Sequence, residues 1–166
     1  GFNVQPHATR FPYRTPPARL GVVVPTGAPL IVVSAVDSFE GRRQIASWAK
    51  TYSRVFVDLR AHGTVGVMCL VPHDDIPSYL ATLESDEDAP EPACGMEGTA
   101  FVGMMLAGIV TAQLNAYFRG LPTFRKFVFE AGTFTALHTE YNEPDGRYAN
   151  QEPQFDPNAQ IEQMLQ

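Results

Sequence analysis

The sequence is short of the residues that build disulfide scaffolds, structural zinc sites and nucleic-acid-binding surfaces. Only two of its 166 residues are cysteine, and 12 Lys and Arg stand against 18 Asp and Glu, for a formal net charge of -6. Two cysteines cannot supply a four-cysteine zinc site, and so few favour a reducing compartment over a disulfide framework. An acidic chain lacks the basic surface that nucleic acid or an anionic membrane would attract. We therefore expect a cytoplasmic protein that binds neither.

Several familiar signatures of function are also missing. The sequence contains no glycine-rich phosphate loop and no serine nucleophile elbow, and its four histidines have no metal-ligand spacing. We find no apolar run of the roughly 20 residues that a membrane span requires. What remains is the composition of a soluble globular protein, with 45% hydrophobic and 18% charged residues, and at this length one domain is expected.

The first half of the chain has the pattern of an α/β domain. Residues 30–36 are a continuous apolar, largely β-branched run, which is typical of a parallel strand covered on both faces. Asp37 and Ser38 end this run, and one of them is expected to cap the helix that follows. The predicted elements are a helix over residues 39–52, with Arg42 largely outside its apolar face, and strands over 55–59 and 64–71. A strand, a helix and further strands predict a mixed sheet.

The second half begins with an acidic, proline-rich stretch at residues 84–93, which predicts an exposed loop. A long helix free of proline is expected next, followed by two closing strands. Their predicted ranges are 99–119, 127–129 and 134–137. After residue 140 the chain becomes polar, so we divide it into a domain over residues 1–140 and a flexible polar tail over 141–166.

Three residue types in this pattern could carry chemistry. Asp37 follows a strand at the edge where open α/β sheets bind ligands, so it could hold Mg²⁺, although a plain helix cap is the simpler interpretation. Cys94 precedes the long helix, whose positive end would lower the pKa of a thiol, although lone cysteines are often inert apolar fillers. Cys69 lies within a predicted strand and fits the inert interpretation. Arg42 and Arg43 could contact an anion, but solvated surface arginines are the commoner outcome.

Two segments together resemble the ThiF/MoeB/HesA superfamily, to which ubiquitin-activating enzymes belong. The segment from Val32 to Arg42 is similar to that family's strand ending in T-D-N-F-x-x-R, with Asp37, Phe39 and Arg42 in the matching places. The segment from Pro92 to Gly98 is similar to the family's P-x-C-x-x-x-G segment, and Cys94 matches its cysteine.

The resemblance implies a Rossmann-like mixed sheet and an ATP-dependent adenylyltransferase. Such an enzyme activates the C-terminus of a ubiquitin-like or sulfur-carrier β-grasp protein, with ATP and Mg²⁺ as cofactors and usually as a homodimer, for which the long apolar helix could serve. It implies that Asp37 holds the metal, that Ser38 and Arg42 help to bind the nucleotide, and that Cys94 accepts the activated carboxylate.

The sequence also departs from the family's pattern. Ser38 replaces the usual Asn, paired zinc cysteines are absent, and the glycine-rich loop of the nucleotide-binding N-terminal half has no counterpart. We therefore expect the chain to be the C-terminal part of a longer enzyme, inactive in adenylation alone. The alternatives are a non-catalytic ThiF-like interaction or dimerisation module, and an unrelated α/β fragment in which Asp37 only caps a helix.

Overall fold

A five-stranded mixed sheet forms the centre of the protein. The computed structural model describes residues 14–20, 28–83, 99–138 and 141–142. The strands lie in the order β1-β2-β3-β5-β6, with β1 parallel to β2 and every other neighbouring pair antiparallel. They are Ile31–Ser34 (β1), Val55–His62 (β2), Val65–Pro72 (β3), Lys126–Glu130 (β5) and Thr135–His138 (β6). The prediction of an α/β fold with a mixed sheet is confirmed at this level.

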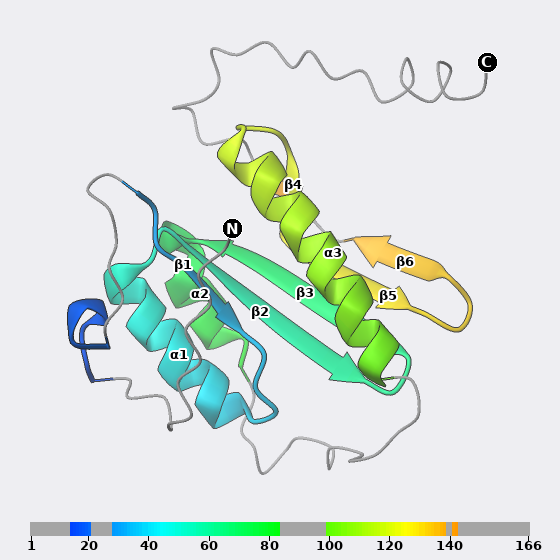
Figure 1. The fold of residues 1–166 in the computed structure, drawn as a ribbon, viewed down its shortest axis with the longest axis horizontal. Coiled ribbons are helices and arrows are strands. Elements are labelled where there is room, and N and C mark those ends of the chain that lie inside the picture. The colour runs from blue at the N-terminus through cyan, green and yellow to red at the C-terminus, as the bar shows by residue number, and fades with distance from the viewer. Residues whose placement is uncertain (1–13, 21–27, 84–98, 139–140, 143–166) are drawn as a thin grey trace.

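Helices cover both faces of the sheet (Figure 1). The helices Phe39–Tyr52 (α1) and Ile76–Ala81 (α2) pack on one face, and Thr99–Phe118 (α3) crosses β2 and β3 on the other. Alternate residues of β2 serve the two cores: Phe56 packs with α1 and α2, whereas Val55 and Val57 pack with α3. Because both faces of β2 are buried, its sequence begins as an unbroken apolar run.

Local patterns place most elements where the sequence predicts them. Helix α1 has the predicted bounds, and Ser38 caps it by accepting a hydrogen bond from the Gly41 amide at 3.1 Å. The hairpin between β2 and β3 turns at Gly63, whose φ of 57° lies in the left-handed region that glycine tolerates. The short helices α2, Pro17–Leu20 (η1) and His73–Asp75 (η2) were not predicted.

One prediction about α1 is wrong. Arg42 was expected largely outside the apolar face of the helix, but it is only 5% exposed. It is buried because Asp58 on β2 lies beside it and supplies the opposite charge.

The polar tail predicted from residue 141 begins with two ordered residues. Tyr141–Asn142 (β7) pairs antiparallel with Thr123–Phe124 (β4) in a separate two-stranded sheet. The rest of that segment, residues 143–166, and the acidic stretch at residues 84–93 lie outside the described residues.

The expectation that no apolar run is long enough to span a membrane is wrong for helix α3. Its stretch Ala100–Phe118 is long and apolar enough, by length and composition, to cross a membrane, and only 17% of it is buried. One such helix is weak support for a membrane span, because a core helix passes the same test. Val102, Leu106 and Val110 of α3 pack in the core between the helix and the sheet.

Candidate functional site

The loop between β1 and α1 displays the carboxylate that the sequence singles out. Asp37 is exposed and makes no ion pair with another described residue. Ser38, and not Asp37, caps α1. Asp37 therefore stands at the carboxyl end of a strand, beside the positive end of a helix dipole, without serving as the cap.

The buried side chain of Arg42 holds this loop in place through hydrogen bonds. One guanidinium nitrogen, Nη2, donates to the carbonyl oxygen of Val36, the residue before Asp37. The other, Nη1, donates to a carboxylate oxygen of Asp58 and, at 2.9 Å, to the carbonyl oxygen of Leu59. The predicted nucleotide contact of Arg42 is thus a buried side chain whose two terminal nitrogens bind the protein itself.

Asp58 lies between two arginines. Its side chain is fully buried, and its second oxygen accepts a hydrogen bond from Arg60 Nε at 2.7 Å. The Arg60 guanidinium stacks 5.4 Å from the centre of the Phe39 ring, at the start of α1. Two positive charges against one negative charge leave the group with a surplus positive charge, and the Arg60 side chain is still 31% exposed.

Sequence reasoning missed both Asp58 and Arg60. Within a strand whose neighbours are apolar, a charged residue such as Asp58 is a signal, because charges are almost never buried without a partner. The partner could not be identified from the sequence, since Arg42 lies 16 residues away on another element.

Of the two cysteines, the structure describes Cys69 but not Cys94. Cys69 is partly buried in β3, directly opposite Asp58 in the strand register. Burial, together with the Asp58 carboxylate, raises the pKa of the Cys69 thiol, so little of it is the nucleophilic thiolate. Cys94 lies outside the described residues, so its predicted role stays a prediction.

The described residues can contribute to a magnesium nucleotide site, but they do not complete one. They contain no group of three or more His, Cys, Asp or Glu side chains arranged to hold a metal. Mg²⁺ at nucleotide sites commonly takes one or two carboxylates together with phosphate oxygens and water, so the exposed carboxylate of Asp37 fits such a site in part.

Comparisons with known proteins leave the family open. No known protein family and no curated protein matches the sequence. A solved structure titled "Crystal Structure of SeMet PaaA" is similar with a TM-score of 0.43 and 19% identity, over 74% of this chain and 45% of that one. This chain therefore spans less than half of that protein's length, and a likeness this distant carries no argument about activity.

Proposed function

We propose that the chain is the C-terminal part of an ATP-dependent adenylyltransferase of the ThiF/MoeB/HesA type. The enzyme activates the C-terminal carboxylate of a ubiquitin-like or sulfur-carrier β-grasp protein. The observation that carries the proposal is the placement of Asp37. It is an exposed carboxylate on a braced loop, at the carboxyl end of β1 and the start of α1.

In this proposal each residue has one task. Asp37 would hold Mg²⁺, whose charge would offset that of the ATP phosphates while the carrier carboxylate displaces pyrophosphate. Arg42 positions Asp37 through its hydrogen bond to Val36 and does not contact the nucleotide. Arg60 supplies the surplus positive charge near the start of α1, where an anion is favoured. The Cys94 thiolate then attacks the acyl adenylate, forming a thioester and releasing AMP.

The open flank of the sheet supports the idea of a missing half. Val33 is 47% exposed on β1, which is the edge strand of the sheet among the described residues. On the exposed surface of α3, a Cβ at Gly103 would meet no atom within 4 Å apart from its adjacent residues and the nearby backbone of its own helix. A further layer that continues the sheet beyond β1 would cover this flank, and it would bring the glycine-rich turn that binds phosphates.

The proposal is tested with the complete enzyme by carrier-dependent ATP-pyrophosphate exchange. We expect Asp37→Asn to lower the exchange rate at least about 100-fold, as the loss of an electrostatic contact to reacting groups does. Asp74→Asn, which removes an exposed carboxylate on η2, is the matched control and should leave the rate unchanged. Equal rates for the two variants would remove Asp37 from the reaction.

A second arm separates the two chemical steps. Cys94→Ser should leave exchange intact but abolish the thioester with the carrier, whereas Cys69→Ser should affect neither. The 166-residue chain alone should show no exchange, and brisk exchange would contradict the assignment to a C-terminal part.

One observation favours a second candidate, a non-catalytic ThiF-like interaction or dimerisation module. Helix α3 contains no charged residue over its 20 positions, yet Met104 is 78% and Phe101 is 44% exposed. A monomeric protein rarely leaves such a surface uncovered. Normal partner binding and normal function in cells after Asp37→Ala and Cys94→Ala would favour this module over the enzyme.

A further inference from the structure

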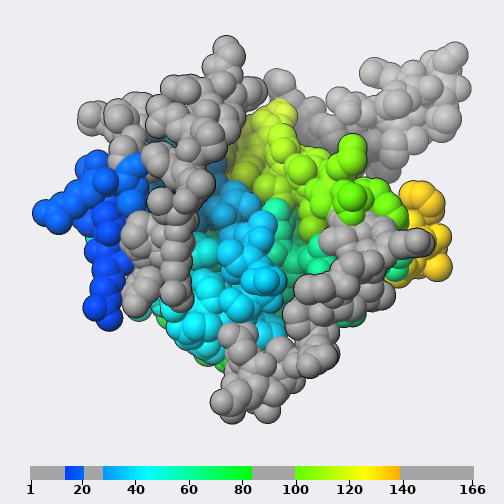
Figure 2. Space-filling model, turned by 60° about the horizontal axis from the view of Figure 1, so that its bottom comes forward, coloured from blue at the N-terminus to red at the C-terminus, as the bar shows by residue number. Residues whose placement is uncertain are grey.

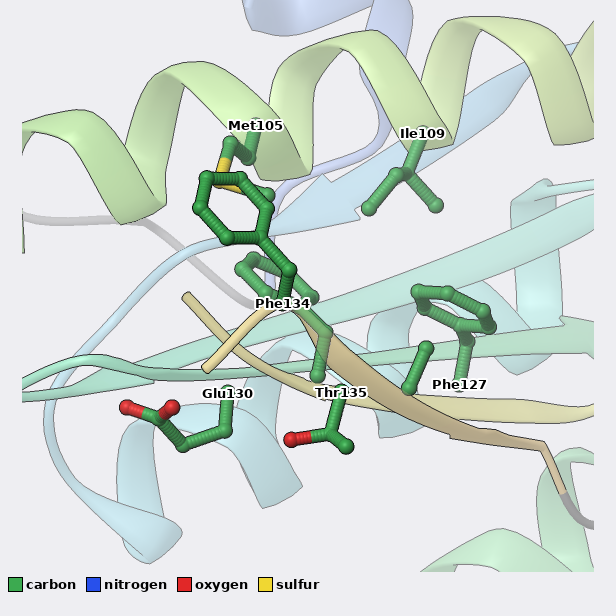
Figure 3. A pocket seen from close by; sticks show the side chains of 8 residues that line it. Met105, Ile109, Phe127, Glu130, Phe134 and Thr135 are labelled. Atoms are coloured by element: carbon green, nitrogen blue, oxygen red, sulfur yellow. The ribbon is translucent and has the colours of Figure 1, made fainter. Parts of the chain in front are cut away.

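A small apolar hollow opens between α3 and the hairpin formed by β5 and β6. Met105 and Ile109 of α3 point toward the hairpin (Figure 3), and Phe134 in the hairpin turn lines the hollow with them. The hollow has a volume of about 120 Å³. It is lined by Met105, Ile109, Phe127, Phe129, Glu130, Phe134, Thr135 and Ala136.

The size and lining of the hollow select its occupant. Pockets for cofactors and comparable ligands usually measure about 300–1,000 Å³, so this one is too small for a nucleotide. An apolar cavity of about 150 Å³ can hold a benzene ring. The hollow therefore suits one large apolar side chain.

The neighbouring strand offers a backbone for pairing. Strand β6 is the last strand of the sheet in the part of the chain that the structure describes, and all four of its residues are exposed. In the space-filling view it stands at one margin of the molecule, beside α3 (Figure 2). An edge strand presents unpaired N–H and C=O groups with which an extended peptide can pair.

The hairpin turn holds an aromatic residue in a costly conformation. Phe134 has a φ of 53°, a backbone region that bulky residues rarely adopt, and it is 85% exposed. Strain of this kind often accompanies binding sites. The Glu130 carboxylate supports the turn by accepting hydrogen bonds from the Thr133 amide at 2.6 Å and from its hydroxyl at 2.7 Å.

Glu130 also places a negative charge beside the hollow at neutral pH. Hydrogen bonds from Thr64, from Thr133 and from the Gly132 amide lower the pKa of its carboxyl group to about 2. A segment with a Lys or Arg next to its apolar residue complements both features.

We propose that the hollow and the outer edge of β6 form a docking site for an extended segment of a partner protein, in which one large apolar side chain adjoins a Lys or Arg. The apolar side chain fills the hollow, the segment pairs with β6, and the cationic side chain lies near Glu130. This inference depends on the surface alone and holds whether or not the chain takes part in adenylation.

The test uses peptides selected from a displayed random decapeptide library on the 166-residue chain, with Ile109→Trp, which fills the hollow, as the counter-selection. We expect the selected peptides to share a large apolar residue beside Lys or Arg. By fluorescence anisotropy, Ala in place of that apolar residue should weaken binding roughly 10- to 100-fold. Glu in place of the cation should weaken it about 3- to 5-fold, and N-methylation of alternate amides about 5-fold.

Two protein variants separate a loss of binding from a loss of folding. Phe134→Gly should lower peptide affinity at least about 10-fold while keeping or raising the melting temperature, because glycine adopts the positive φ without strain. Val33→Ser is the matched control: Val33 is an exposed apolar residue (47%) on β1, at the opposite end of the strand order from β6, and its replacement should leave affinity unchanged.

Three results would overturn the proposal. One is a selection that yields no peptide sensitive to Ile109→Trp in a folded variant. Another is binding that Val33→Ser weakens as much as Phe134→Gly. The third is a rise in peptide affinity on deleting residues 143–166, which would make this chain's own tail the occupant in place of a partner.

Discussion

At the scale of single residues, the buried charge of Asp58 has the largest expected effect on stability. It satisfies Arg42, which in turn holds the loop that displays Asp37. We predict that Asp58→Ala lowers the free energy of unfolding by about 3–5 kcal/mol, because it leaves a buried guanidinium without its counter-ion. Urea denaturation followed by circular dichroism measures this loss.

An exposed ion pair in the same chain provides the control. Arg125 and Asp75 are paired with side chains that are 44% and 37% exposed. Asp75→Ala should therefore cost less than about 1 kcal/mol. Similar losses for the two variants would show that the Asp58 group does not brace the loop.

The lowered pKa of Glu130 predicts how the stability of the protein changes in acid. Its pKa in the folded protein, about 2, lies below the ordinary value of 4.5. Its contribution to stability is thus complete above pH 4.5 and is lost as the pH falls toward 2. We expect an NMR titration of the Glu130 side chain to have its midpoint near pH 2, and Glu130→Gln to flatten this part of the stability profile. A midpoint above 4 would contradict the hydrogen-bonded turn.

At the scale of elements, two adjacent residues at the start of α1 have different roles: Ser38 stabilises the helix, and Asp37 is the residue proposed to take part in the reaction. Ser38 caps the helix, so Ser38→Ala should lower the free energy of unfolding by about 1 kcal/mol. Asp37→Ala should change stability by less than about 0.5 kcal/mol, because the carboxylate is exposed and is not the cap. Thermal and urea unfolding of both variants check this, and the reverse ranking would mean that Asp37 is the true cap.

Helix α3 has one face that packs on the sheet and one that is exposed. Val102, Leu106 and Val110 lie four residues apart and pack on the sheet. The opposite side, with Met104 and Gly108, is exposed and carries no charge. A membrane-surface helix normally carries Lys or Arg on its polar face, and α3 has none, so another protein surface is the better partner for this side.

At the scale of the whole molecule, we predict that the chain forms a homodimer through this exposed side of α3. Small residues such as Gly108 let two helices approach closely, and an uncharged surface meets its own copy without repulsion. Light scattering after size exclusion should give twice the monomer mass for the 166-residue chain. Met104→Glu and Gly108→Glu should each give the monomer mass.

A surface variant elsewhere distinguishes this contact from a general effect of added charge. Ser47→Glu, on the exposed side of α1, should leave the dimer intact. A wild-type chain that stays monomeric at high concentration, or that binds zwitterionic lipid vesicles instead, would rule out α3 as a dimer contact.

The sequence by itself determined the elements whose signals are local. The β-branched run and its polar end predict β1 and the start of α1, and the proline-free apolar stretch predicts α3, because strand and helix patterns depend on near neighbours. It did not reveal α2, whose six residues are too few for a helical period to stand out.

Only the tertiary structure decided which distant residues meet. The strand order brought Asp58 against Arg42, and this pairing turned an arginine expected at the surface into a buried support for the loop. The hollow likewise needs α3 and the β5–β6 hairpin side by side, from segments about 25 residues apart. Such contacts depend on how the elements pack in three dimensions, and no periodicity along the chain records them.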